Sequence, residues 1–344
     1  MNEKKKSKVT IKDIAKHLGV SFSTVSKALN DDPLVAEDTR KKVHEKAAEM
    51  GYFPNLMAIG LRSNQTKTIG MILNDIENPT RSHIIKRISM DMAKYGYTSF
   101  IFDSSYDEVV ERKNIINMLS RLPDSVIISP VNTNFKNLAL LEDIFDRTII
   151  LSKRKSQVSA HYVHMDHIRS GYIAASTMLS KGHTQNLVIM EPTSYPSGAQ
   201  YYEGVKQAYR DHGVALNTNL ILYGYPSIEE GRKIITNLYD EHNRNFTLDF
   251  TGVIASNDMI AIGVYKAATQ LGLKIPEDLS VIGCDDDPIA SLVTPQLTTL
   301  IYPKEKIADY CSEILVDRLV KNNPGMKHYS LEPQLVMRNS IKDM

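Results

Sequence analysis

Between residues 68 and 344, short apolar runs alternate with longer segments of helical periodicity, and this alternation restricts the possible folds more than any other feature. The runs expected to form strands are Ile69–Leu73, Thr98–Phe102, Val126–Ile128, Thr148–Leu151, Leu187–Met190, Gly252–Ala255 and Val281–Cys284. Repeated strand–helix units place parallel strands in a sheet that helices cover on both faces. Because this stretch is too long for one such core, we expect two sheets.

The composition is that of a folded globular protein, with 42% hydrophobic and 24% charged residues among 344. No stretch approaches the roughly 20 apolar residues that cross a bilayer. The N-terminus leads into a polar helix rather than the apolar segment of a signal peptide. We therefore expect a cytoplasmic protein with no membrane partner. Cys284 and Cys311 lie in apolar runs, so neither a disulfide nor redox chemistry is expected.

Basic residues are concentrated at the N-terminal end of the chain. Residues 1–30 hold seven lysines against Glu3 and Asp13, whereas the formal net charge of the whole chain is only +1. A lysine run is often only a solvated tail. A basic cluster on a compact helical unit, however, is also the electrostatic signature of a surface that binds phosphates.

Two short helices with a tight turn between them are predicted in this basic region. Thr10 and Asp13 have the spacing of a capping box, and the helix that they start ends at Gly19. Ser21 is suited to cap a second helix, Phe22–Leu29. This is the helix-turn-helix arrangement, in which the second helix presents its first residues to base edges in the major groove of DNA.

The outward face of the second helix carries side chains suited to that contact, namely Ser23, Thr24, Ser26 and Lys27. Hydroxyls reach bases or phosphates without holding the helix away from the groove, and a lysine adds a cation. A third helix of about Ala36–Met50 completes the unit before Gly51. Spacing alone also allows a three-helix bundle with no DNA role.

Particular segments resemble the LacI/GalR family of bacterial repressors. In the N-terminal region they are Val9–Lys16, Gly19–Asn30, Thr39–Arg40 and Gly51–Asn55; beyond it they are Thr68–Ile72, Gly182–His183, Ser256–Gly263, Pro276–Asp286, Leu297–Thr299 and Leu335–Arg338. The resemblance implies an all-α helix-turn-helix headpiece (1–54), a hinge helix and linker (55–67) and an α/β body (68–344). The body would have the type I periplasmic-binding-protein fold, with two Rossmann-like subdomains and three crossovers near 166, 298 and 328.

The resemblance also implies which residues contact DNA. They are Thr10, Ser21, Phe22, Ser23, Thr24, Ser26, Lys27 and Asn30 in the headpiece, and Asn55, Ala58 and Leu61 in the hinge. Leu61 falls at the position of the family's minor-groove wedge, although a leucine there could instead be helix core. Ile59 replaces an arginine common in the family, and Gly60 lowers helix propensity by about 1 kcal/mol relative to Ala. Hinge folding should therefore depend strongly on DNA.

An effector is implied in the cleft between the subdomains. The candidate contacts are Thr80, Arg81, Arg154, Asp166, Tyr201, Tyr225, Asn257, Asp258 and Asp285. Thr80 and Arg81 stand where the family often has ring-stacking aromatics, and Tyr201 stands where it has an arginine. Tyr225 could supply an aromatic face or be packing. By contrast, Arg154, Asp166 and Asp258 keep their family positions.

Two interpretations of this cleft stay open. Arg81, Lys153 and Arg154 could make it cationic, for a sugar-derived effector with a carboxylate or phosphate. Alternatively, Arg81 and Lys153 are surface charges, and only Arg154 and Asp258 face the ligand. Asp285–Pro288 lacks the ligand spacing of a metal site, and no catalytic motif is present, so we expect no metal, no cofactor and no enzyme.

The implied function is that of a sequence-specific repressor of a carbohydrate or related catabolic operon, controlled by a small-molecule effector. The alternative is control by a protein partner on the body surface. A homodimer on a pseudo-palindromic double-stranded operator is expected. Apolar residues for its interface are expected near Ile84–Ile88 and around Leu292–Val293. No heptads follow Arg338, which favours a dimer over a tetramer.

Overall fold

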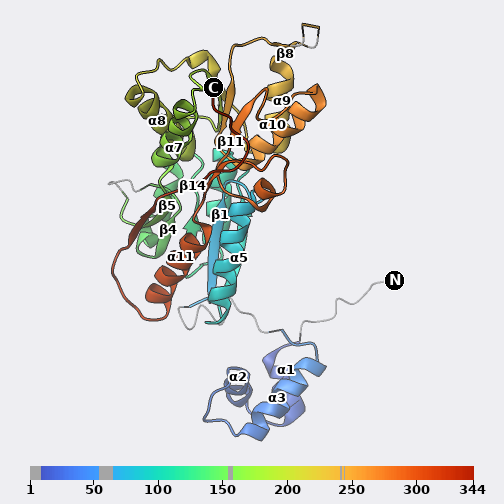
Figure 1. The fold of residues 1–344 in the computed structure, drawn as a ribbon. Helices are drawn as coiled ribbons and strands as arrows, with labels where there is room; N and C mark the ends of the chain where they lie inside the picture. Colours follow the sequence, from blue (N-terminus) through green and yellow to red (C-terminus); the bar gives the residue numbers. More distant parts are fainter. Residues whose placement is uncertain (1–8, 54–64, 154–157, 241, 244) are drawn as a thin grey trace. The chain divides into compact units, whose positions relative to one another are not determined.

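The structure, a computed structural model, describes residues 9–53, 65–153, 158–240, 242–243 and 245–344 (Figure 1). The chain divides into two compact units, Met1–Thr66 and Lys67–Met344, which we call the headpiece and the body. The expected hinge contacts Asn55, Ala58 and Leu61, and the expected effector contact Arg154, lie outside the described residues.

The headpiece contains the three helices expected from the sequence: α1 (Ile11–Leu18), α2 (Phe22–Leu29) and α3 (Glu37–Glu49). Each helix turns its small and branched apolar side chains to a shared core, which consists of Ile14, Ala15, Val25, Ala28, Val35, Val43 and Ala47. The turn between α1 and α2 passes through Gly19 at a φ of 65°, a conformation that glycine adopts without steric strain. The outward face of α2 is thereby left free of packing.

The first subdomain of the body is built on a six-stranded parallel sheet with the order β13-β5-β4-β3-β1-β2. The strands are β1 (Thr68–Leu73), β2 (Thr98–Asp103), β3 (Ser125–Ile128), β4 (Thr148–Ile150), β5 (His161–Met165) and β13 (His328–Leu331). Helices α5 (Pro79–Ala93) and α11 (Lys304–Leu319) pack on one face. Helix α6 (Glu108–Leu119) and the 3-10 segment η1 (Lys136–Arg147) pack on the other.

The second subdomain has a four-stranded parallel sheet with the order β11-β10-β6-β7. Its strands are β6 (Asn186–Met190), β7 (Ile221–Tyr223), β10 (Gly252–Ala255) and β11 (Ser280–Ile282). Helices α7 (His167–Ser180) and α8 (Pro196–Asp211) cover one face, and α9 (Ile228–Leu238) and α10 (Asp258–Leu271) cover the other. Short elements complete it: η2 (Thr218–Leu220), β8 (Tyr239–Asp240), β9 (Asn245–Phe246) and η3 (Pro288–Ser291).

The chain passes between the two subdomains three times. It leaves β5 for α7 at Asp166, returns from β12 (Thr299–Ile301) to α11, and leaves again between β13 and β14 (Gln334–Val336). Strands β12 and β14 pair antiparallel, so two of the passages run side by side. The fold class expected from the sequence, a helical headpiece with a two-sheet parallel α/β body, is confirmed.

Glycine contacts bring the helices of the second subdomain unusually close. A Cβ on Gly204 of α8 would lie 1.9 Å from the carbonyl oxygen of Ile168, and one on Gly171 of α7 would lie 2.1 Å from that of Tyr201. The α9–α10 pair is similar, with Gly231 against Ile260. The atoms that a new Cβ would meet belong to the backbone, which cannot move aside by changing a side-chain rotamer. The absence of a side chain at these positions therefore sets where α8 presents Tyr201.

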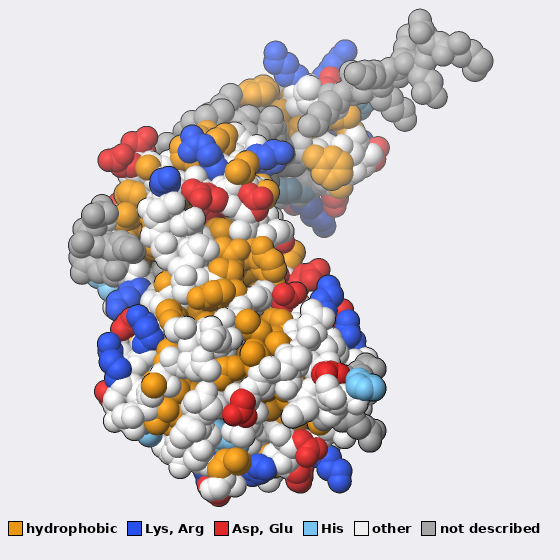
Figure 2. All heavy atoms as spheres, turned by 90° about the horizontal axis from the view of Figure 1, so that it is seen from above, with side chains coloured by type: hydrophobic (Ala, Val, Ile, Leu, Met, Phe, Trp, Pro, Cys, Tyr) orange, Lys and Arg blue, Asp and Glu red, His pale blue; other side chains and the backbone are white. Residues whose placement is uncertain are grey.

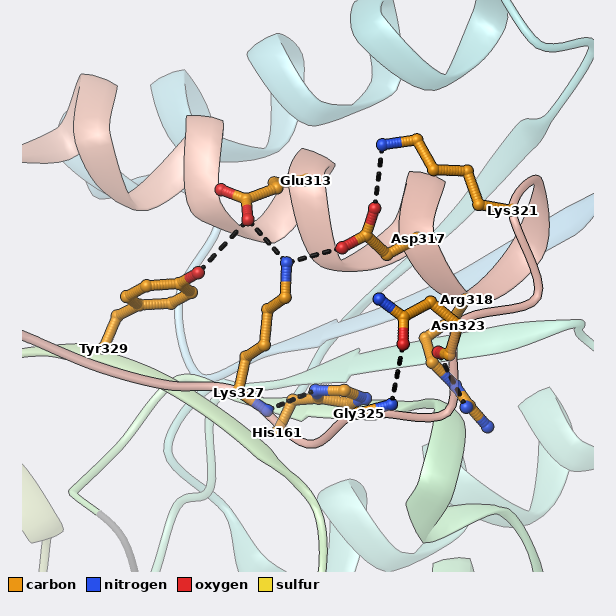
Figure 3. A network of polar contacts seen from close by, with 9 residues as sticks. All are labelled: His161, Glu313, Asp317, Arg318, Lys321, Asn323, Gly325, Lys327 and Tyr329. Atoms are coloured by element: carbon orange, nitrogen blue, oxygen red, sulfur yellow. Dashed lines mark hydrogen bonds and ion pairs between the residues drawn. The ribbon is translucent and has the colours of Figure 1, made fainter.

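A polar network ties α11 to the chain that returns into β13 (Figure 3). Lys327 Nζ lies 2.5 Å from both Glu313 Oε1 and Asp317 Oδ2 of α11, and these carboxylates raise the pKa of the lysine. The backbone N–H of Lys327 donates to Nδ1 of His161 in β5, at 3.1 Å. Tyr329 donates to Glu313 at 3.2 Å. The network thus holds β13 in register against β5.

Apolar side chains on α5 do not form a surface patch. Ile84, Ile85 and Ile88, expected on a dimer face, are buried against the sheet and α11 because the helix turns its apolar stripe inward. The exposed apolar residues of this subdomain include Ile101 on the edge strand β2, Val109, Val110, Ile116 and Leu122 on or just after α6, and Ile76, Met90 and Tyr95 before, on and after α5. Leu292 in the second subdomain is 77% exposed.

One face of the body carries mixed charge. On the face seen from above, at the α8–α10 end, acidic and basic side chains are interspersed around an apolar band (Figure 2). This face therefore shows no concentrated basic surface. Cys284 and Cys311 are buried and free. In the described ranges, no helix combines the length and the apolar character that crossing a membrane requires.

Candidate functional site

The first turn of α2 gathers three hydroxyl groups. Ser21 is the N-cap, and its Oγ accepts from the backbone N–H of Thr24 at 3.1 Å. The same oxygen lies 2.7 Å from Ser23 Oγ and 2.8 Å from Thr24 Oγ1. Hydroxyls rotate freely to change donor and acceptor roles. Together with the unpaired N–H groups of the helix N-terminus, they form a surface suited to phosphate oxygens and base edges.

The other expected headpiece contacts lie close to this turn in sequence. Phe22 is 42% exposed, and Lys27 is exposed on the same helix. Asn30 closes α2 by donating from its side chain to the carbonyl oxygen of Ser26 at 2.8 Å. Thr10 stands at the start of α1, where its hydroxyl donates to Asp13 Oδ2 at 2.7 Å and helps to lower the pKa of that carboxyl.

The charge of the headpiece is available to a partner. Within residues 9–53, none of the ion pairs involves the exposed lysines Lys12, Lys16, Lys27, Lys41 and Lys42. Lys46, in contrast, pairs with Glu49 at 2.6 Å. Residues 9–53 hold seven Lys and Arg against seven Asp and Glu, so their formal charge is balanced. The exposed lysines outside ion pairs are nevertheless available to attract a polyanion.

A pocket with a volume of about 40 Å³ lies between the two subdomains, and we call it the inner compartment. It is lined by Asn78, Thr80, Arg81, His167, Glu191, Ser197, Gly198, Tyr201, Pro226, Ser256, Asn257, Asp285 and Tyr302. Many of these follow the carboxyl ends of strands, where ligands bind in open α/β sheets. Five residues named from the sequence, Thr80, Arg81, Tyr201, Asn257 and Asp285, meet here.

Arg81 is the cation of the inner compartment. Its Nη1 donates to Ser129 Oγ at 3.0 Å. Burial lowers the pKa of Arg81, but Tyr106, Tyr302, Glu191 and Asp285 more than offset this, so the pKa is raised and the side chain stays charged. The interpretation of Arg81 as a surface charge is wrong, because its side chain lines the pocket.

Polar atoms in the inner compartment lack protein partners. The Tyr201 hydroxyl belongs to a side chain that is only 2% exposed, and neither it nor the buried Ser256 Oγ makes a hydrogen bond within the described chain. A buried polar group left unpaired costs about 1–3 kcal/mol. His167 in the same wall is neutral, since burial, with Arg81 and His164, lowers its pKa to about 3. These atoms are free to pair with a bound hydroxyl or water.

Asp258 and Asp166 do not line this pocket. The fully buried carboxylate of Asp258 is turned inward, where it accepts from Thr299 Oγ1 at 2.6 Å and from the backbone N–H of Asp287 at 2.8 Å. Burial raises the pKa of Asp258 to about 7. Asp166 caps α7 and lines a separate groove of about 240 Å³ with the exposed Lys153. Lys153 therefore adds no charge beside Arg81.

A wider hollow of about 480 Å³, which we call the outer compartment, shares Asn78 and Pro226 with the inner one. Its lining is Asp75, Glu77, Asn78, Asp103, Ser105, Tyr106, Tyr225, Pro226, Ser227, Ile228 and Met259. Tyr225, expected from the sequence, is 54% exposed here. Asp75, Asp103 and Tyr106 were missed, although each closely follows the end of β1 or β2, a position that could have indicated them.

The acidic run after β11 is structural in this region. Asp286 accepts from Arg338 Nη2 at 2.6 Å, and Asp287 accepts from Thr80 Oγ1 at 3.2 Å. Nowhere in the described part of the chain do three or more His, Cys, Asp or Glu side chains come together as a metal site would require. The run therefore holds the β11 loop against neighbouring segments.

Comparison with known proteins matches both units. Residues 10–55 match the family of bacterial regulatory proteins of the lacI type, and residues 175–341 match the periplasmic binding protein-like domain. The transcriptional regulator DegA of Bacillus subtilis is 32% identical over 341 residues, with 98% of this chain and 99% of DegA covered. The transcriptional repressor PurR of Photorhabdus laumondii is 29% identical, with 97% of each chain covered.

Solved structures share the fold along the whole chain. A LacI family regulator from Silicibacter pomeroyi superposes with a TM-score of 0.84 at 23% identity, covering 97% of this chain and 99% of that one. The lac repressor dimer bound to operator superposes with a TM-score of 0.80 at 22% identity, covering 98% and 100%. The chain thus belongs to the LacI family of DNA-binding transcriptional regulators.

Proposed function

We propose that this protein represses a carbohydrate or related catabolic operon and that a small molecule in the cleft controls its binding to the operator. The observation that carries the proposal is the combination of unpaired lysines and a hydroxyl cluster on α2 with a cleft that holds unpartnered buried hydroxyls. Named relatives support it, since PurR is a repressor and a 25% identical LacI family regulator from Enterococcus faecium holds ribose.

If the headpiece binds operator DNA through phosphate contacts, the affinity should fall steeply as the salt concentration rises. Several phosphate contacts release counterions, and about six of them would lower affinity by roughly 10³ between 50 and 200 mM salt. Lys27→Ala should weaken binding and reduce the salt slope by about one. Fluorescence anisotropy with operator fragments recovered by genome-wide mapping measures both. Lys233→Ala on the body serves as the control, and a flat salt dependence would refute a phosphate-binding headpiece.

A homodimer is proposed to form through the apolar edge made by β2 and the neighbouring residues of α6. Ile101 is 50% exposed on this edge strand, and Val109 and Ile116 add to the same exposed apolar group. A two-fold dimer would place two headpieces on a pseudo-palindromic operator.

Replacing Ile101 with lysine should convert the dimer to a monomer, because a charge would be buried in an apolar contact. Sedimentation velocity at micromolar concentration checks this. Leu292→Lys, at an apolar position in the second subdomain that is more exposed than Ile101, is the control. Loss of the dimer in Leu292→Lys, with Ile101→Lys unaffected, would move the interface to the second subdomain.

The small volume of the inner compartment favours a second candidate, in which a protein partner on the body surface controls DNA binding. The two candidates separate in one assay, which adds either the ultrafiltrate or the retained macromolecular fraction of a cell extract to the protein–operator complex. A change in operator affinity with the ultrafiltrate supports the small-molecule effector. A change only with the macromolecular fraction supports the protein partner.

A further inference from the structure

The outer compartment is acidic. Asp75, Glu77 and Asp103 contribute carboxylates to its wall, and no lysine or arginine is among the described residues that line it. In the described part of the chain, none of the three takes part in an ion pair. Asp75 accepts only the Glu77 N–H at 2.8 Å, and Asp103 accepts the N–H and hydroxyl of Ser105 at 3.1 and 3.0 Å. Each carboxylate therefore keeps lone pairs and an uncompensated charge.

Tyrosine rings stand among these carboxylates. The ring of Tyr106 lies 5.0 Å from that of Tyr195 and 5.7 Å from that of Tyr225, at interplanar angles of 32° and 55°. The Tyr106 hydroxyl donates to Glu191 Oε1 at 2.9 Å, which holds the ring in place. Aromatic faces attract cations through the ring quadrupole. Carboxylates and tyrosines thus favour the same sign of charge on a ligand.

The inner compartment restricts the chemistry of the ligand independently of the outer one. Among the described residues that line the inner compartment, Arg81 is the one cation, and Glu191 stands in the same wall as its acidic counterpart. Burial raises the pKa of Asp285, in the same lining, well above its usual range. Glu191 therefore offsets the charge that Arg81 would offer to an anion. Tyr201 lines this compartment, and its buried hydroxyl makes no hydrogen bond within the described residues. A cavity of about 40 Å³ admits a single small group, such as the hydroxyl end of a longer ligand.

We propose that the cleft binds a hydroxylated organic amine, such as an amino sugar. Its protonated nitrogen lies in the outer compartment among Asp75, Asp103 and the tyrosine rings, and a hydroxyl reaches Tyr201 in the inner one. The outer volume of about 480 Å³ suits a ligand of monosaccharide size. This inference rests on the proposed effector role of the cleft, and it differs from the anionic effector that one of the two interpretations of the sequence offered.

Calorimetry on the full chain tests the charge preference with matched probes. Glucosamine, galactosamine and mannosamine are each compared with their N-acetyl derivative, the parent hexose and the 6-phosphate. We expect at least one amine to bind about tenfold more tightly than its N-acetyl derivative, as two partly exposed carboxylates would give. In Asp75→Asn/Asp103→Asn that advantage should fall to about twofold or less, whereas Asp143→Asn on η1 should retain it.

The inference is overturned if no amine binds more tightly than its N-acetyl derivative, or if the phosphates bind most tightly. It is also overturned if the double variant keeps the full advantage of the amine. Operator affinity, measured separately with each probe, distinguishes the two proposals. An amine that binds without changing operator affinity supports the ligand class and contradicts the regulatory role. A neutral sugar that alone changes operator affinity supports the role and contradicts the ligand class.

Discussion

Replacing Gly204 with alanine should destabilise the body by about 3 kcal/mol or more, at the upper end of the cost of overpacking. The new Cβ would lie 1.9 Å from the carbonyl oxygen of Ile168 and 2.7 Å from the backbone nitrogen of Tyr172. Helix α8 must then move away from α7 along its length. The higher helix propensity of alanine returns only about 1 kcal/mol. Urea denaturation followed by circular dichroism measures the loss.

Gly272→Ala is the matched control for this prediction. Gly272 ends α10 at a φ of 71°, and a Cβ there would meet nothing within 4 Å. Its replacement should cost only the strain of the left-handed conformation, about 1–2 kcal/mol. If Gly204→Ala is no less stable than Gly272→Ala, the helices have room to separate and the close contact does not position Tyr201.

Asp258→Asn should remove a large pH dependence of stability. Burial raises the pKa of Asp258 to about 7, whereas an aspartate that is not buried has a pKa of 3.8. As pH rises from 4 to 7, the unfolded chain loses this proton while the folded chain keeps it, so the free energy of unfolding falls. The full loss is on the order of 4 kcal/mol. The stability that Asp258 contributes is therefore greatest below pH 4 and is lost by about pH 7.

Asparagine can keep both contacts of this side chain. Its oxygen can accept from the Asp287 N–H, and its amide can donate to the Thr299 hydroxyl. The variant should thus be more stable than the wild type at pH 8, with the difference shrinking or reversing near pH 4. Urea unfolding at pH 4 to 8 measures it. A difference that stays constant over this range would show that the carboxyl is not protonated by burial.

The stability of the wild type must be subtracted from that of Asp258→Asn at each pH, because other groups titrate in the same pH range. Burial lowers the pKa values of His161, His164, His167 and His183. Below about pH 6.5 these histidines gain protons in the unfolded chain but not in the folded chain. Their contribution to the free energy of unfolding therefore rises with pH. The histidines are shared by wild type and variant, and their contribution cancels in the difference.

The sequence predicted those elements whose own pattern is strong. The headpiece helices and seven body strands carry apolar periodicity or continuous apolar runs, which bury regardless of distant context. Strand β5 was missed because His161 and His164 interrupt its apolar run, although the imidazole of His161 is buried and bonded to the backbone of Asp146 and Lys327. Strands β7 and β13 lie at sheet edges, where less apolar sequence suffices.

The cleft was predictable only in part, for a related reason. Arg81, Tyr201 and Asp285 fall at positions that the family resemblance indicates, whereas the tyrosine cluster depends on how two subdomains close on each other. Tyr106 and Tyr195 come from different subdomains, and no local pattern links them. Adjacent residues can also diverge. Asn257 lines the pocket and caps α10, but the next residue, Asp258, points into the core.

Because the chain passes between the subdomains three times, the elements of the first subdomain are not synthesised one after another. The first sheet acquires five strands by Met165, but α11, which covers one of its faces, begins only at Lys304. At bacterial translation rates the ribosome needs on the order of 10 s to make the intervening residues. During that interval the headpiece can already be folded, while the part of the sheet face that α11 will cover is still exposed. A chain that exposes apolar surface during synthesis is prone to aggregation, which is the hazard that chaperones counter.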